Sequence, residues 1–109
     1  MASVTINVTI RNGAASAPDC EASRGSEITW MVDGDIQPGD EVSIGRFRRN
    51  DGGPGSPMAK GDGSRRRTGA GPIGDSVRND AATGLYSYDI AFVRAGVASV
   101  LDPQIQIKP

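Results

Sequence analysis

The residues of this chain that could do chemistry are mainly cations gathered in one short window. Seven basic and two acidic side chains lie between positions 46 and 67, so this arginine window carries a charge of +5. The rest of the chain holds 5 basic and 11 acidic residues, a charge of −6. The window is the candidate contact surface, and its basic residues are Arg46, Arg48, Arg49, Lys60, Arg65, Arg66 and Arg67.

Three interpretations of the arginine window stay open. A run of like charges is often only a solvated segment that repels itself. Flexible arginines among glycines can also follow the phosphates of a nucleic acid or another polyanion, although Phe47 alone could stack on a base. In the third interpretation, the +5 window of one copy lies on the −6 remainder of the next, in a head-to-tail geometry. We expect a non-catalytic contact with a protein partner or a second copy.

Four carboxylates surround one expected turn, and they form the next candidate site. They are Asp33, Asp35, Asp40 and Glu41. Carboxylate oxygens at a turn could hold calcium, but Asp-Gly-Asp lacks the remaining spacing of a calcium-binding loop. We therefore expect solvated turn carboxylates and no metal site.

The types of residue present give little support for catalysis. The chain has no histidine, so no imidazole can activate a nucleophile near neutral pH. Cys20 lies between Asp19 and Glu21, whose charges raise a thiol pKa. The nucleophile-elbow and lysine-bearing phosphate-loop motifs are missing too. We expect a small, buried cysteine, no cofactor and no enzymatic activity.

Alternating apolar and polar residues predict β-strands along most of the chain. The turn signals between them include Asn12-Gly13 and Asp102-Pro103. Trp30 should lie between two sheets with Ile6, Val8, Tyr88, Ile90 and Ile105, and Tyr86 should share the inward face of its strand with Tyr88 and Ile90. Strands are expected over residues 3–10, 20–22, 28–32, 42–47, 86–93, 97–101 and 105–107. One domain of residues 1–109, built as a sandwich of about seven or eight strands, fits this pattern.

Residues 50–75 differ from the rest of the chain. They contain eight glycines and three prolines, and Met58 and Ile73 are their only large apolar residues. Such a composition does not favour a packed core. We expect a long mobile loop at about residues 50–75, with at most one short strand near residues 65–68.

The cysteine count and the amino terminus bear on location. One cysteine cannot form an internal disulfide, which favours a reducing compartment. The first residues show no basic region followed by an apolar run, and no segment approaches the ~20 apolar residues that cross a bilayer. A net charge of −1 suggests neither nucleic acid nor membrane binding. The expected location is the cytoplasm.

Three spaced segments resemble the cupredoxin-like β-sandwich family. The first is Gly25-Ser26-Glu27-Ile28-Thr29-Trp30, similar to that family's run of glycine, acidic residue, aliphatic, polar residue and Trp. The second is Gly84-Leu85-Tyr86-Ser87-Tyr88, similar to the strand before the copper-ligand loop. The third, residues 101–107, looks like the closing strand. The resemblance implies an all-β Greek-key sandwich, and an immunoglobulin-like sandwich is the alternative.

The same resemblance implies a scaffold without copper. A blue-copper centre needs two imidazoles and a thiolate. This chain has Ile90 where the family places its thiolate, and Phe92-Val93-Arg94-Ala95 in the loop that supplies a His and a Met. Asp33-Gly34-Asp35 follows the Trp strand, where the other His belongs. The expectation is a copper-free relative that uses the sandwich for another purpose.

Overall fold

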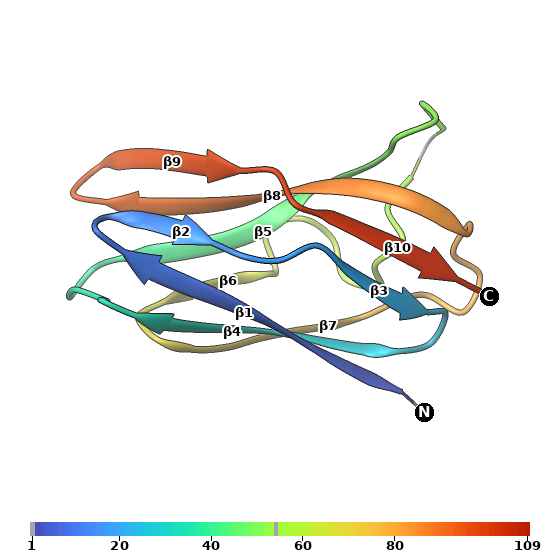
Figure 1. Cartoon of the computed structure of the whole chain (residues 1–109), viewed down its shortest axis with the longest axis horizontal. Coiled ribbons are helices and arrows are strands. Elements are labelled where there is room, and N and C mark those ends of the chain that lie inside the picture. Colours follow the sequence, from blue (N-terminus) through green and yellow to red (C-terminus); the bar gives the residue numbers. More distant parts are fainter. Residues whose placement is uncertain (1, 54) are drawn as a thin grey trace.

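The regular structure of the chain consists of β-strands packed in two sheets (Figure 1). The computed structural model describes residues 2–53 and 55–109. The strands in this part are β1 (Ser3–Arg11), β2 (Ala14–Ser16), β3 (Cys20–Ser23), β4 (Glu27–Gly34), β5 (Glu41–Arg49), β6 (Arg66–Thr68), β7 (Gly71–Ser76), β8 (Gly84–Arg94), β9 (Val97–Leu101) and β10 (Gln104–Lys108). The predicted all-β sandwich is confirmed, with ten strands rather than seven or eight in the described residues.

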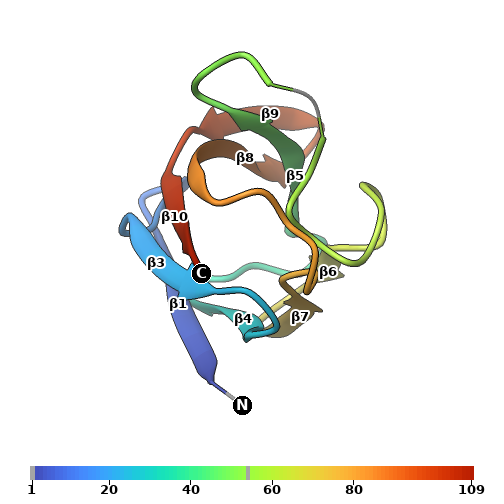
Figure 2. The ribbon, with the colours of Figure 1, turned by 90° about the vertical axis from the view of Figure 1, so that its right-hand side faces the viewer.

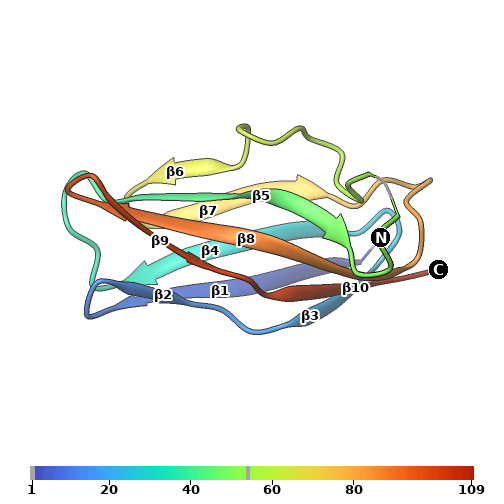
Figure 3. The same cartoon turned by 90° about the horizontal axis from the view of Figure 1, so that it is seen from above.

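The two sheets divide the strands unevenly. Four strands form one sheet in the order β2-β1-β4-β7, and five strands of the other sheet lie in the order β3-β10-β8-β5-β6. β9 belongs to the second sheet and pairs with residues 90–94 of β8. β1 and β4 are parallel, as are β3 and β10. Seen from one end, the sheets curl toward each other around the core (Figure 2). From above, β5 and β8 cross over β4 and β7 (Figure 3).

The core follows the alternation of the sequence. Trp30 on β4 is fully buried, and its Nε1–H donates a hydrogen bond of 3.1 Å to the hydroxyl of Tyr88 on β8. The Phe47 ring stacks on Tyr88 with their centroids 4.8 Å apart. The residues predicted to surround Trp30 are all buried, namely Ile6, Val8, Tyr88, Ile90 and Ile105, and so is Tyr86, which was predicted to face inward. The inward faces of both sheets were therefore predicted correctly.

Residues 50–75 contain more ordered structure than the expected loop: β6 corresponds to the short strand expected near residues 65–68, whereas β7 was not expected. β6 pairs with β5, and β7 pairs with β4 over six residues despite its two glycines and one proline. Met58 is buried and forms an isolated bridge with Val77, and Ile73 is buried opposite Trp30. Composition misled because the neighbouring strands supply the apolar side chains and the hydrogen-bonding partners that this segment lacks. Pro54 lies outside the described residues.

The described part of the chain contains no helix that is long and apolar enough to cross a membrane.

Candidate functional site

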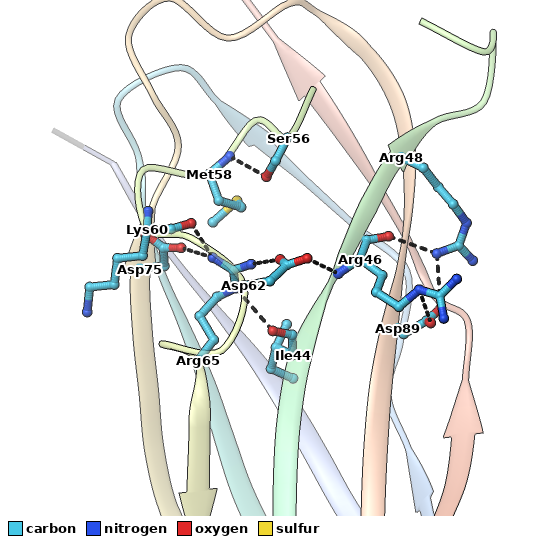
Figure 4. A network of polar contacts seen from close by, with 10 residues as sticks. All are labelled: Ile44, Arg46, Arg48, Ser56, Met58, Lys60, Asp62, Arg65, Asp75 and Asp89. Carbon is cyan, nitrogen blue, oxygen red and sulfur yellow. Dashed lines mark hydrogen bonds and ion pairs between the residues drawn. The ribbon is translucent and has the colours of Figure 1, made fainter. Parts of the chain in front are cut away.

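An irregularity in β5 places two arginines of the window on the outer face of the larger sheet. The pairing of β5 with β8 shifts between Gly45 and Arg48, which is a β-bulge. Arg46 adopts a left-handed backbone conformation with a φ of 56°. Because of the bulge, Phe47 turns into the core while Arg46 and Arg48 turn toward Asp89 on β8 (Figure 4). The side chain of Arg46 is 80% exposed.

Arg46 and Arg48 are held differently. The only ion pair of Arg46 among the described residues joins its Nε to Asp89 Oδ2 at 3.5 Å. Arg48 donates hydrogen bonds to the Arg46 carbonyl at 2.8 Å, to Asp89 at 3.0 Å and to Asp102 at 2.7 Å. The bond to Asp89 raises the pKa of the Arg48 guanidinium above its usual value. Arg48 is therefore a fixed part of the sheet, and Arg46 is a projecting cation.

Arg65, predicted to be part of an exposed contact surface, is fully buried. Its guanidinium donates to Asp75 Oδ2 at 2.8 Å, to Asp62 Oδ1 at 2.5 Å, and to the carbonyls of Lys60 at 2.6 Å and Ile44 at 3.2 Å (Figure 4). Its central carbon lies 5.0 Å from the centroid of the Phe47 ring. A buried cation needs such partners, because an unpaired charge would be expelled from the core. Arg65 thus joins residues 60–62 to β5 and β7 and cannot contact a partner.

Asp62 connects this buried arginine to the projecting one. Its Oδ1 accepts from Arg65, and its Oδ2 accepts the backbone N–H of Arg46 at 3.1 Å. Gly45 allows this approach, since a Cβ at that position would lie 3.2 Å from Asp62 Oδ1. The left-handed turn at Arg46 is therefore stabilised by a carboxylate that Arg65 positions.

The other four residues of the predicted contact surface have separate surroundings. Arg49 pairs with Asp51 at 2.5 Å, and Arg66 pairs with Glu41 at 3.4 Å while its side chain stays 61% exposed. Lys60 Nζ donates to the Gly74 carbonyl at 3.0 Å, and Arg67 donates to the Ala70 carbonyl at 2.8 Å. The Gly53 N–H and Arg49 lower the pKa of Asp51. Only Arg46 and Arg66 are both strongly exposed and held by long ion pairs.

The charge of the window is largely balanced inside the chain. Five of its seven cations form ion pairs with carboxylates. Four of the partners lie outside the window, namely Glu41, Asp75, Asp89 and Asp102. Much of the positive charge of the window is therefore neutralised by carboxylates of the same molecule, most of which lie in the −6 remainder of the chain. Sequence analysis missed these four partners, because nothing local marks which distant carboxylate faces an arginine.

A groove lined by both exposed arginines lies on the outer face of the larger sheet. Strand pairing aligns Arg66, Ser43, Ala91 and Val100 in one row across β6, β5, β8 and β9. The groove has a volume of about 320 Å³. Its lining includes the small residues Gly45 and Ala91 and the cations Arg46 and Arg66. We call this the arginine groove. Its guanidinium groups can bind a carboxylate, and Val100 can contact an apolar side chain.

The predicted set of turn carboxylates divides into two kinds. Asp40, expected to be solvated, is buried and accepts two hydrogen bonds from Arg94, at 3.0 and 2.8 Å. These bonds lower the pKa of the Asp40 carboxyl below its usual value. Asp33 and Asp35 are exposed, as predicted, and line a cleft of about 480 Å³ with Arg11. No group of three or more potential metal ligands occurs in the described residues.

Cys20 lies on β3 and is half-buried rather than fully buried. Burial, followed by the charges of Asp19 and Glu21, raises the pKa of its thiol to about 11. The direction of this shift is the one that the neighbouring carboxylates predicted. The thiol stays protonated near neutral pH, so it is a poor nucleophile and a poor metal ligand there.

Comparison with known proteins assigns the chain to no family: no protein-family model matches it, and no curated protein matches it significantly.

Proposed function

We propose that this protein is a non-catalytic binding or self-assembly module that contacts its partner through the arginine groove. The observation that carries the proposal is the placement of Arg46. A bulge and a left-handed backbone turn bring this long cation onto the face of the sheet, where one contact of 3.5 Å holds it. A non-glycine residue in this conformation costs free energy, and such costs concentrate at functional sites.

The proposed scaffold is a copper-free relative of the cupredoxin-like sandwiches. Two of the three segments that carry this resemblance lie mainly in β4 and β8, and they meet in the core through the hydrogen bond from Trp30 to Tyr88. Ile90, at the position of the family's thiolate, is buried in the same core. The resemblance supports a scaffold role, and the single cysteine supports the proposed cytoplasmic location.

The size of the arginine groove favours a protein partner. Small-molecule sites are usually clefts of ~300–1,000 Å³, and the arginine groove, at about 320 Å³, is at the lower end of that range. A polyanion partner is less well supported, because a phosphate backbone is bound by a series of cations and only Arg46 and Arg66 of the seven are both strongly exposed and held by long ion pairs. A non-catalytic role fits the lack of any histidine in the chain.

The test uses a glutamate-rich peptide as a probe for an acidic protein partner. We expect the parent protein to bind it weakly and less well at high salt, since screening weakens exposed ion pairs. The double variant Arg46→Ser/Arg66→Ser should lose most of this binding. The matched control is Arg78→Ser/Lys108→Ser, which removes the same charge from exposed positions outside the arginine window and should bind like the parent.

Two results would count against this proposal. Equal peptide binding by both double variants would mean that only net charge matters. Binding of single-stranded DNA with a steep salt dependence, together with no binding of the peptide, would favour the polyanion alternative.

A further inference from the structure

The ion pairs of the folded chain leave few charged groups available for a partner. Nine of the 13 carboxylates form ion pairs among the described residues. The other four are Asp19, Glu27, Asp33 and Asp35. Asp19 accepts the N–H of Gln104, and Glu27 lies at the other end of β4 from Asp33. Asp33 and Asp35 therefore form the only close pair of carboxylates that have no ion pair in the described part of the chain.

These two aspartates flank a hollow that is large enough for a guanidinium group. The Asp33/Asp35 cleft lies where β1 and β4 end side by side, with Thr9 paired to Asp33 and Ile10 to Gly34. Its shape is set by backbone: the Asp35 N–H donates to the Ile10 carbonyl at 2.8 Å. Gly34 has a φ of 103°, and a Cβ there would collide with the Ile10 backbone. The cleft is thus a rigid feature that keeps two carboxylates exposed.

The other charges around the cleft leave it acidic. Arg11 lines its wall, and Arg94 donates to the Asp35 carbonyl while its charge is matched by Asp40. Two exposed carboxylates therefore face one exposed guanidinium. Cations of a partner could therefore pair with Asp33 and Asp35.

We propose that the Asp33/Asp35 cleft of one copy receives Arg46 and Arg66 from the arginine groove of a second copy. This inference rests on the proposed function and identifies the partner as the chain itself. Arg46 projects from the sheet and is 80% exposed, so it can enter a cleft of about 480 Å³. A net charge of −1 for each copy produces little overall repulsion between them.

The geometry of this contact is head-to-tail. The arginine groove lies on the outer face of β5, β8 and β9, whereas the cleft lies at the ends of β1 and β4 in the other sheet. Because the two surfaces differ, a bound pair leaves the cleft of one copy and the groove of the other free. Such a contact forms rings or open chains rather than a closed two-fold dimer.

Charge reversal provides the decisive experiment. One variant carries Arg46→Glu and Arg66→Glu, and the other carries Asp33→Lys and Asp35→Lys. Neither should associate alone, because each has two like-charged surfaces. An equimolar mixture should associate, because a reversed groove then meets a reversed cleft and an unchanged groove meets an unchanged cleft. Sedimentation velocity at low salt measures all four samples: the parent, the two variants and the mixture.

A matched control separates the cleft from general charge. Glu27→Lys changes the same charge on the same strand at another exposed position, and it should associate like the parent, whereas Asp33→Lys should weaken association at least tenfold. A parent that is monomeric at low salt, or a mixture that fails to associate, would overturn this inference. Binding of the glutamate-rich peptide by such a monomer would leave the proposed function standing, which distinguishes the two failures.

Discussion

Replacing Arg65 with Met provides the strongest test of how the arginine window is built. Sequence analysis would predict a harmless change in an exposed loop, whereas the structure predicts loss of a buried cation. The substitution leaves Asp75 with its side chain fully buried and without its guanidinium partner. Breaking one side of a buried ion pair costs about 3–5 kcal/mol, because the remaining charge is uncompensated. The free energy of unfolding of a small domain is only ~5–15 kcal/mol.

Further losses add to this cost. The carbonyls of Ile44 and Lys60 lose a donor, and Phe47 loses the cation over its ring. A buried acceptor that loses its donor costs about 1–3 kcal/mol, and of these two carbonyls the one of Ile44 accepts a buried hydrogen bond. We therefore expect Arg65→Met to lower the free energy of unfolding by about 5 kcal/mol, the upper end of the range for a broken buried ion pair. Arg66→Met, one residue later and exposed, should change stability by less than about 0.5 kcal/mol.

The assay is urea unfolding of Arg65→Met, Asp75→Asn and the double variant. The double variant should be more stable than the sum of the two single losses predicts, because removing both charges leaves neither unpaired. In the folded protein, Asp75 Oδ1 accepts hydrogen bonds from the backbone N–H groups of Lys60 and Ser76. Asp75→Asn keeps a side-chain oxygen that can accept both of these bonds. Strictly additive losses, or a loss below about 1 kcal/mol for Arg65→Met, would refute the assignment of Arg65 as a buried structural cation.

Three further predictions concern the core, the acid stability and the cysteine. Trp30→Ala should cost about 3–5 kcal/mol and unfold most of the protein in thermal or urea melts; a melting temperature near that of the parent would place Trp30 outside the core. The pKa of Asp40 is lowered in the fold by Arg94, so its contribution to stability is present at neutral pH and lost as the pH falls through the lowered pKa. Asp40→Asn should therefore flatten the acid dependence of unfolding, and an unchanged acid profile would contradict this. Alkylation of Cys20 should be slow at neutral pH and accelerate toward about pH 11; a rate equal to that of the denatured chain would show that the thiol pKa is not raised.

The sequence by itself determined the class of fold and the members of the core. Alternation with a period of two is a local property, and it assigns each residue of a strand to one of two faces. Ile6, Trp30, Tyr88 and Ile105 could be placed inside for that reason, without knowing which strands pair. The lack of histidine and the effect of Asp19 and Glu21 on the Cys20 pKa also needed no three-dimensional information.

Only the tertiary structure decided what the arginines do. Arg48 forms a hydrogen bond with Asp102, which is 54 residues away in the sequence, and Arg94 forms one with Asp40 at the same sequence separation. Arg65 is a core residue although its neighbours Arg66 and Arg67 are not fully buried, because only its side chain faces Phe47 and Asp75. β7 forms from a segment rich in glycine and proline because β4 supplies its partner strand. The energy of a buried ion pair or of strand pairing depends on both partners, and composition describes only one of them at a time.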